Sequence, residues 1–239
     1  MKCNNDILKT LFEKIHQNKK AELSYILGAK YVAVTNSAGH IGVCATLGNE
    51  IDGFDIDNLN FDCTEDRIVI NALVNSYINY STRFDGGGDI FSIINFDKYS
   101  SIVMIGYFGP LVNKFMGKNI ALNIFDLDQR EVPVLPMEQQ AEYLSKADCV
   151  ILTSTSISNN TFEGIVRNTP SSSDIFLLGP STPMDDALFE YPNVKGLFGS
   201  VFKPFDENTL KIIADGGGTC LFKQYMEKIY KMRDDCGKS

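Results

Sequence analysis

Short apolar runs alternate with helical patterns from Ser101 to the end of the 239-residue chain. The runs that predict strands are Ile102–Ile105, Asn119–Phe125, Cys149–Thr153, Asp174–Leu178 and the weaker Lys195–Val201. Apolar spacing predicts helices over Leu111–Met116, Met137–Leu144, Thr161–Arg167, Asn208–Ala214 and Leu221–Met232. Strands that are joined through helices lie parallel, and the helices cover both faces of their sheet. This part of the chain is therefore predicted to be an α/β unit with a mostly parallel sheet.

A glycine-rich turn follows the first of these runs. Gly106 and Gly109 bracket Tyr107 and Phe108, and Pro110 comes next. Glycine permits a tight turn and a close approach between backbone and ligand. Proline fits the first turn of a helix, where its missing N–H costs little. The pattern predicts a strand–turn–helix unit that places a helix N-terminus beside a ligand crevice.

Small and hydroxyl-bearing residues occur after several of the predicted strands. Besides Gly106–Gly109, these turns are Thr153–Asn159, Gly179–Thr182 and the region near Gly199 and Ser200. Parallel strands deliver such turns to one edge of the sheet, where open α/β sheets bind ligands. We therefore expect a binding crevice, although the same residues also serve in ordinary turns. The candidate ligand-binding residues are Gly106, Tyr107, Gly109, Asp126, Thr153, Ser154, Asn159, Thr161, Gly179, Ser181 and Thr182.

Some of these candidates carry more specific expectations. The hydroxyls of Ser181 and Thr182 are expected to be available at the edge of the sheet. Tyr107 is expected either to offer its ring and hydroxyl to the ligand or to pack into the interface between two domains. Asp126 stands about twenty residues beyond Gly106, where dinucleotide-binding proteins place a ribose-binding acid. The turn itself is Gly-x-x-Gly rather than Gly-x-Gly-x-x-Gly, so a nucleotide is the lesser alternative.

The first part of the chain carries a different pattern. Apolar spacing predicts helices over Asn5–Gln17 and Arg67–Ile78. Ala21–Leu27 either extends the first helix or forms a short second one. Tyr31–Thr35 and His40–Thr46 are typical of two strands joined in a hairpin. These elements predict a small α+β unit of helices and an antiparallel hairpin.

Three successive glycines mark the break between the two patterns. Gly86–Gly88 predicts a flexible joint, and Asp89 can cap the short segment that follows. A glycine loop that wraps a ligand is the alternative. The predicted domains are therefore residues 1–95, an α+β unit, and residues 96–239, an α/β unit.

Composition narrows the classes of partner. The formal net charge of −8 disfavours nucleic acid and anionic membranes. No apolar run is long enough to cross a bilayer, and the N-terminus is too polar for a signal peptide, so a cytoplasmic protein is expected. The two histidines and six cysteines have no metal-binding spacing. If a metal binds through thiolates, Cys149 and Cys220 are the candidates.

Several of these segments resemble the signatures of a known family. The segments are Ile105–Leu111, Ala147–Thr153, Asn159–Glu163, Leu178–Pro183 and Asp215–Gly218 with Phe222. Together they resemble the heavy-metal chelation domain over most of residues 90–230. The helix-plus-hairpin start, with Asn71–Leu73 on its later helix, is similar to the partner domain that often precedes it. That partner has a fold like the N-terminal domain of enolase.

The resemblance implies a Rossmann-like second domain and a ligand site in the cleft between the two domains. It also implies binding of a divalent or heavy-metal ion, or of a metal-bearing or pterin-like small molecule. We therefore expect a protein that binds a metal, a metal complex or a small molecule. The alternative is a transferase-like enzyme that uses a nucleotide-type or pterin-like cofactor on the second domain. A scaffold with a vestigial crevice and a homo-oligomer also stay open.

Overall fold

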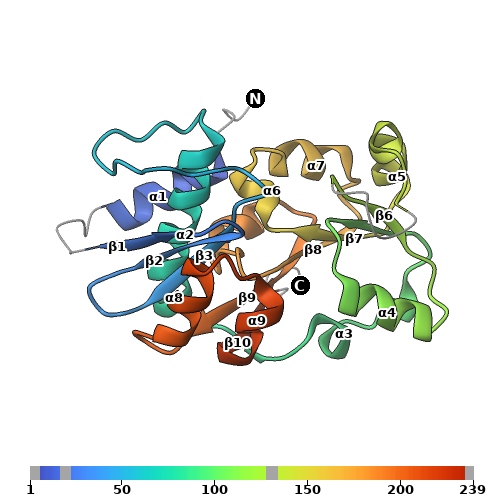
Figure 1. Ribbon diagram of the computed structural model, residues 1–239. Coiled ribbons are helices and arrows are strands. Elements are labelled where there is room, and N and C mark those ends of the chain that lie inside the picture. Colours follow the sequence, from blue (N-terminus) through green and yellow to red (C-terminus); the bar gives the residue numbers. More distant parts are fainter. Residues whose placement is uncertain (1–5, 17–22, 128–133, 235–239) are drawn as a thin grey trace.

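Two sheets organise the chain in the computed structural model, which describes residues 6–16, 23–127 and 134–234. The first is an N-terminal three-stranded antiparallel sheet with helices, and the second is a seven-stranded mixed sheet whose strands are mostly parallel (Figure 1). The predicted fold class is confirmed for both parts.

The N-terminal unit contains the predicted hairpin and two helices. Its elements are α1 (Ile7–His16), β1 (Ser24–Leu27), β2 (Tyr31–Thr35), β3 (Ile41–Ala45) and α2 (Thr64–Ser81). β2 and β3 pair antiparallel, with Thr35 opposite Ile41. Asn5 and Gln17, the predicted ends of the first helix, lie outside the described residues.

A strand replaces the helix that is predicted over Ala21–Leu27. Ser24–Leu27 forms β1, which pairs antiparallel with β2 and has Leu27 opposite Val32. The pairing across this short connection supplies partners for the backbone groups of β1, as a helix would have done internally. Ala21 and Glu22 lie outside the described residues.

The seven-stranded sheet has the order β4-β10-β9-β8-β7-β5-β6. Its strands are β4 (Gly86–Gly87), β5 (Ile102–Ile105), β6 (Asn123–Phe125), β7 (Cys149–Thr153), β8 (Asp174–Leu178), β9 (Val194–Phe202) and β10 (Met226–Met232). The α-helices around it are α3 (Ile90–Ile93), α4 (Gly109–Gly117), α5 (Gln140–Lys146), α6 (Thr155–Ser158), α7 (Phe162–Asn168), α8 (Glu207–Ala214) and α9 (Thr219–Phe222). The 3-10 turns are η1 (Phe96–Lys98), η2 (Met137–Gln139), η3 (Asp186–Glu190) and η4 (Lys223–Tyr225). The five strands from β5 to β9 are parallel, whereas β10 and β4 are antiparallel to their neighbours.

The strand β10 occupies a segment where the sequence predicts a helix. Apolar residues over Leu221–Met232 have helical spacing, but only the short α9 and a 3-10 turn precede a strand. β10 pairs with β9 along its whole length. Ile229 and Tyr230 then point into the cores on opposite faces of the sheet. The helical prediction is wrong because this long-range pairing overrides the local preference.

The glycine stretch Gly86–Gly88 begins as a strand at the edge of the large sheet. Gly86 and Gly87 pair with Tyr230 and Ile229 of β10. The N–H of Asp85 also donates to the carbonyl of Tyr230 at 2.9 Å. The predicted joint is therefore attached to the sheet by main-chain hydrogen bonds. The domain boundary between residues 95 and 96 stays a prediction.

Hydrophobic cores cover both faces of the large sheet. On one face, α3, η1 and α4 pack against side chains such as Met104 and Ile151. On the other, α1 and α2 of the N-terminal unit pack with α5, α6 and α7 against side chains such as Val103 and Val150. Neighbouring residues of each strand point to opposite faces, as the period of two requires. The N-terminal unit therefore shares a continuous core with the second sheet.

The C-terminal part of the chain covers the other face of the three-stranded sheet. Ile213 of α8 and Phe222 of α9 pack with Ala33 and Val43 of the hairpin, and α8 lies over this sheet in Figure 1. The two parts of the chain thus pack against each other on more than one surface. Among the described residues, no helix has both the length and the apolar character that a membrane crossing requires.

Asp89 joins three elements and is expected to make stability depend on pH. It accepts hydrogen bonds from Lys114 of α4 at 2.7 Å and from Lys228 of β10 at 3.0 Å, and it caps α3 through the N–H of Phe91. Burial raises the pKa of Asp89, but the two lysines and the Phe91 N–H outweigh burial and lower this pKa to about 2.

Because the pKa of Asp89 is lower in the folded state, its contribution to stability should be present at neutral pH. The contribution should be lost as the pH falls from about 5 towards 2. We expect the stability difference between wild type and Asp89→Asn to shrink over this range in urea titrations, since asparagine keeps the cap but not the charge. Asp52→Asn, at an exposed position, is the control. A difference that does not change with pH would contradict this role of Asp89.

Candidate functional site

Three neighbouring parallel strands end at one edge of the large sheet. β5, β7 and β8 are in register, with Ile105 opposite Leu152 and Thr153 opposite Leu178. The turns after these strands therefore lie at the same edge, as the sequence predicts. The carboxyl-edge turns are Gly106–Gly109, Thr153–Thr155 and Gly179–Thr182.

The carboxyl-edge turns approach one another closely. Gly106 has a φ of +90°, and a Cβ atom at this residue would lie 2.8 Å from Cβ of Thr153. Gly179 has a φ of +130°, and a Cβ atom there would lie 3.9 Å from Cε1 of Phe108. The positive φ values favour glycine. The turns thus meet around Thr153 and Phe108. Because Gly106 and Gly179 have no side chains, it is their main chain that lies next to these two residues.

Three predicted site residues surround this convergence. The N–H of Gly106 donates to the carbonyl of Phe125 at 2.8 Å, which places Asp126 next to the glycine turn. The ring of Tyr107 folds towards Gly109, with Cε1 3.4 Å from the position that a Cβ atom would take. Tyr107 also packs, half-buried, against the core on the α4 side. Its role towards a ligand stays a prediction.

Ser154, Ser181 and Thr182 are buried, and their hydroxyls bond within the protein. The oxygens of Ser154 and Thr182 lie 2.6 Å apart, and Thr182 also donates to the carbonyl of Phe198 at 2.8 Å. Ser181 Oγ accepts from the N–H of Ala45 at 3.2 Å. The expectation that the hydroxyls of Ser181 and Thr182 are free is not met: Ser181 bonds to the docked N-terminal unit, and Thr182 bonds to residues that follow or lie in neighbouring strands of the large sheet. A ligand role for them stays a prediction that requires these contacts to open.

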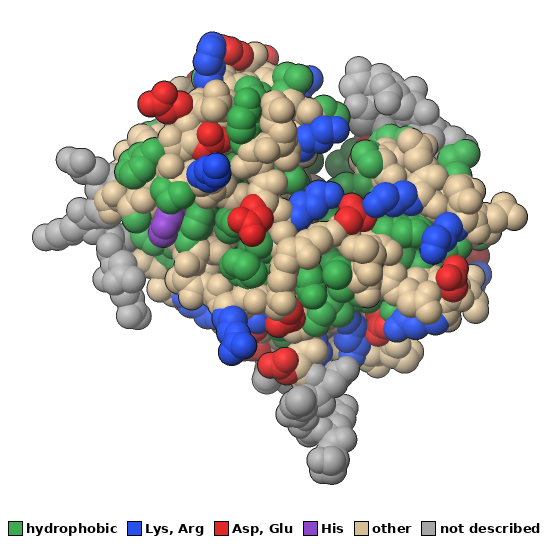
Figure 2. Space-filling model, turned by 90° about the horizontal axis from the view of Figure 1, so that it is seen from below, with side chains coloured by type: hydrophobic (Ala, Val, Ile, Leu, Met, Phe, Trp, Pro, Cys, Tyr) green, Lys and Arg blue, Asp and Glu red, His purple; other side chains and the backbone are tan. Residues whose placement is uncertain are grey.

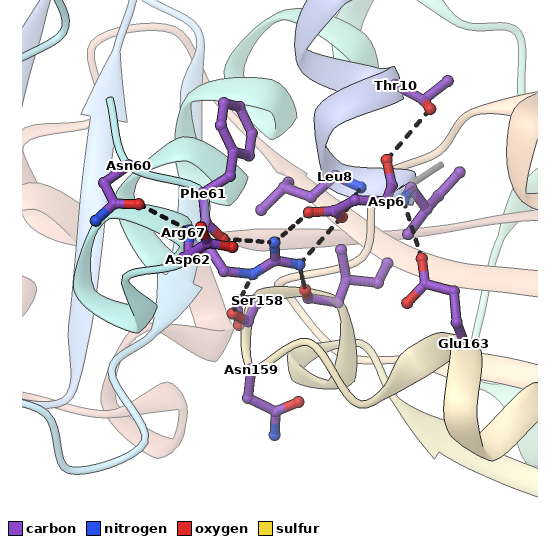
Figure 3. Close-up of polar contacts among 12 residues, drawn as sticks. Asp6, Leu8, Thr10, Asn60, Phe61, Asp62, Arg67, Ser158, Asn159 and Glu163 are labelled. Atoms are coloured by element: carbon purple, nitrogen blue, oxygen red, sulfur yellow. Dashed lines mark hydrogen bonds and ion pairs between the residues drawn. The ribbon is translucent and has the colours of Figure 1, made fainter. Parts of the chain in front are cut away.

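Asn159 and Thr161 lie at the far end of α6 from Thr153. Asn159 Oδ1 accepts from the N–H of Thr161 at 3.2 Å and from its hydroxyl at 2.7 Å, so the pair stabilises the start of α7. In Figure 3, Asn159 follows Ser158, whose carbonyl accepts from Arg67, and its own side chain points away from the guanidinium. The structure therefore brings Gly106 and Thr153 together, with Gly179 on a neighbouring turn. Asn159 and Thr161 instead bond to each other at the start of α7.

Two asparagines on α2, missed as functional candidates by the sequence analysis, hold the two parts of the chain together, and a third bonds within the N-terminal unit. Asn71 donates to the carbonyl of Ser181 at 2.9 Å, and Asn79 donates to the carbonyl of Thr182 at 3.0 Å. Asn75 donates to the carbonyl of Val43 at 3.2 Å. Their spacing of four residues along a predicted helix is the signal that could have revealed a polar docking face.

Arg67, at the start of α2, ties the N-terminal segment to α6. It is 2% exposed and donates from Nε to the carbonyl of Ser158 at 3.0 Å and from Nη2 to the carbonyl of Ile157 at 2.7 Å. Nη1 donates to the carbonyl of Phe61 at 3.0 Å, and both terminal nitrogens bond to the Asp6 carboxylate (Figure 3). All five N–H groups of the guanidinium therefore have partners. Nothing local in the sequence distinguishes this arginine from an exposed one.

The thiol candidates for metal binding lie in different places. Cys149 is buried in β7, and burial together with Asp174 and Asp148 raises the pKa of its thiol well above the ordinary value. Cys220 is exposed on α9, which packs on the three-stranded sheet. Across residues 6–16, 23–127 and 134–234, no group of three His, Cys, Asp or Glu side chains could hold a metal ion.

Together, the fold and the carboxyl-edge turns define an α/β protein with a docked N-terminal α+β unit. The family model described as "Putative heavy-metal chelation" (DUF364) matches residues 89–232, and the chain belongs to this family. No curated protein gives a significant match.

Two solved structures from the same family are similar to this chain over nearly its whole length. A protein of unknown function from Pyrococcus horikoshii has a TM-score of 0.79 and 19% identity, over 95% of this chain and 98% of that chain. A protein of unknown function from Desulfitobacterium hafniense has a TM-score of 0.76 and 16% identity, over 95% of this chain and 98% of that chain. At these identities the likeness shows the fold alone.

Proposed function

We propose that this protein binds a metal complex, meaning a small molecule that brings a metal ion together with ligands of its own. The site is the set of carboxyl-edge turns, beside the docked N-terminal unit. The observation that carries the proposal is the convergence of Gly106, Thr153 and Gly179. Gly106 makes room for the side chain of Thr153, and at Gly179 a Cβ atom would meet nothing closer than 3.9 Å, so a ligand can approach the main chain there. Carboxyl ends of parallel strands are the usual ligand position in open α/β sheets.

A complex fits the described residues better than a bare ion does. A bare ion needs several convergent donors from the protein, and the described side chains offer no group of three. A metal that keeps its own ligands needs at most one donor, and Asp126 beside the Gly106 turn is our candidate. Tyr107 and the hydroxyl of Thr153 would contact the organic part of the molecule. The family description supports the metal.

Native mass spectrometry of protein purified without chelator tests this proposal. We expect a species heavier than the 26.6 kDa chain, by the mass of one small molecule and its metal. Elemental analysis of the same sample should find that metal in equal amount to the bound molecule. A retained organic molecule without metal would contradict the metal-complex assignment, and a retained metal without an organic molecule would favour direct chelation.

A nucleotide-using enzyme is the second candidate, because Asp126 lies next to the Gly106 turn in the position of a ribose-binding acid. Binding of ATP, NAD or S-adenosylmethionine would raise the melting temperature by mass action on the folded state. This candidate requires such a rise in wild type and its loss in Asp126→Asn.

The likeness of the N-terminal unit to the N-terminal domain of enolase is proposed as a likeness of fold alone, because fold does not carry enolase chemistry with it. A homo-oligomer also stays a proposal. Light scattering coupled to size-exclusion chromatography would test it, and a monomer at every concentration would overturn it.

A further inference from the structure

Cys44 of β3 is a buried thiol beside the Gly179–Thr182 turn, one of the carboxyl-edge turns that border the proposed site. Its side chain is 0% exposed, so it contributes nothing to the molecular surface that Figure 2 shows. The next residue, Ala45, donates its N–H to Ser181 Oγ at 3.2 Å. The thiol therefore lies where the N-terminal unit contacts this turn.

Three polar side chains from three other parts of the chain meet at this thiol. Ser158 of α6, Ser181 of the turn and Asn71 of α2 lie within hydrogen-bonding reach of the sulfur. Burial, the largest effect, raises the pKa of the Cys44 thiol, whereas these three side chains lower it, as donors that point at a sulfur do. One strand, two helices and a carboxyl-edge turn therefore converge on one sulfur atom.

Ser181 can donate a hydrogen bond to this sulfur. The hydroxyl oxygen of Ser181 accepts from the N–H of Ala45, and its single hydrogen is left to donate. The thiol of Cys44 directs its own hydrogen to the carbonyl of Ala45, with 3.6 Å between sulfur and oxygen. The lone pairs of the sulfur therefore stay available as a weak acceptor.

The amide of Asn71 depends on the same two neighbours. Its Nδ2 donates to the carbonyl of Ser181 at 2.9 Å, and the amide also lies at the sulfur of Cys44. Within residues 6–16, 23–127 and 134–234, Oδ1 of this buried asparagine has no hydrogen-bond partner. The N–H side alone therefore orients the amide.

We propose that Cys44 is a positioning residue for the proposed site, because it holds the Gly179–Thr182 turn in place. Its sulfur accepts hydrogen bonds from the Ser181 hydroxyl and from the Asn71 amide. Cys44 is covered by protein and acts through the turn rather than on the ligand. This inference rests on the proposed function, in which the ligand approaches the main chain at Gly179, two residues before Ser181.

Hydrogen exchange measured by NMR tests the positioning without any ligand. The N–H of Thr182 closes the turn by donating to the carbonyl of Gly179 at 3.1 Å. We compare its exchange rate with the slowest amides of the large sheet, so that a change in global stability cancels. In Cys44→Ala this amide should exchange about two- to tenfold faster than in wild type, the effect of losing one hydrogen bond.

Two variants are the controls for this exchange measurement. Cys44→Ser should restore the wild-type rate, since a serine oxygen also accepts hydrogen bonds. Cys149→Ala removes the same atom from an equally buried site at the start of β7, and it should leave the Thr182 amide unchanged. Equal Thr182 exchange in Cys44→Ala and wild type would overturn the positioning role, whether or not a ligand is found.

Native mass spectrometry of the same variants connects the turn to the ligand. Cys44→Ala should retain less of the metal complex than wild type, whereas Cys44→Ser and Cys149→Ala should retain as much. Faster exchange in Cys44→Ala with unchanged retention would overturn the proposal, since the turn would then not serve the site. A wild type that retains no molecule would contradict the proposed function, and the exchange rates would still decide whether Cys44 holds the turn.

Discussion

Arg67→Met is expected to lower the free energy of unfolding by about 3–5 kcal/mol, the usual cost of removing one partner from a buried ion pair. Arg67 is 2% exposed and supplies all the hydrogen bonds that α2 makes to the carbonyls of Ile157 and Ser158. Methionine is similar in length but donates nothing. The variant therefore leaves those carbonyls without the arginine donors and leaves the Asp6 carboxylate with the N–H of Leu8 but without its charged partner. Urea titration would measure the loss.

Two further variants separate charge from geometry at this site. Arg67→Lys keeps the charge but cannot reach several acceptors at once, so it should fall between wild type and Arg67→Met. Asp6→Asn should cost less than either, because Asp6 is partly exposed and the carbonyl contacts of Arg67 remain. A loss below about 1 kcal/mol for Arg67→Met would show that the arginine does not hold α2, α6 and the N-terminal segment together.

Gly42→Val is expected to cost more than the 1–3 kcal/mol that is typical of overpacking, or to prevent folding. Gly42 lies in β3 where α2 crosses the hairpin. A Cβ atom at Gly42 would lie 2.0 Å from the carbonyl oxygen of Ala72 and 2.3 Å from the backbone nitrogen of Ser76. Both neighbours are helix backbone, so they cannot rotate away as a side chain could.

Gly42→Ala should show the same effect in smaller degree, because its Cβ atom makes the same contacts. Gly164→Ala is the matched control, since a Cβ atom on Gly164 of α7 would meet nothing within 4 Å. Replacing a glycine inside a helix should raise stability by up to about 1 kcal/mol. Equal unfolding midpoints for Gly42→Ala and Gly164→Ala would contradict the close packing of α2 on β3.

The sequence predicts the fold well where the signal is local. Ile102–Ile105 and Cys149–Thr153 are short apolar runs with glycine or hydroxyl residues after them, and both are parallel strands. The prediction fails at β10, where apolar residues fit a helix and a strand alike. The strand is favoured because the segment pairs with β9 on one side and with Gly86–Gly87 of β4 on the other. Gly86–Gly87 is distant from β10 in sequence, so this pairing cannot be read from the local pattern.

The candidate site is predicted only in part, for a similar reason. The shared edge of the Gly106 and Gly179 turns follows from the parallel strands that precede them. The burial of Ser181 does not follow from those strands, because it depends on the packing of α2, whose Asn71 donates to the carbonyl of Ser181. Arg67 is likewise inconspicuous until the fold brings Asp6 and α6 to it. Contacts between the two parts of the chain thus account for most of what sequence reasoning missed.

Occupancy of the carboxyl-edge turns is the central claim, and one pair of glycine variants tests it most directly. Gly179 and Gly48 both have positive φ, and a Cβ atom on either would meet no atom closer than 3.9 Å. Alanine should strain the backbone at both positions, more at Gly179, whose φ of +130° lies further from the left-handed region than the +81° of Gly48. Only Gly179 borders the proposed site, and a urea titration of each variant shows that it is folded before its ligand is measured.

The measurement is native mass spectrometry of wild type, Gly179→Ala and Gly48→Ala, each purified without chelator. The account predicts that wild type and Gly48→Ala retain the same metal complex, and that Gly179→Ala loses most of it while staying folded. Equal retention by all three proteins would contradict a site at the carboxyl-edge turns, and the absence of a retained molecule in wild type would contradict the metal-complex proposal.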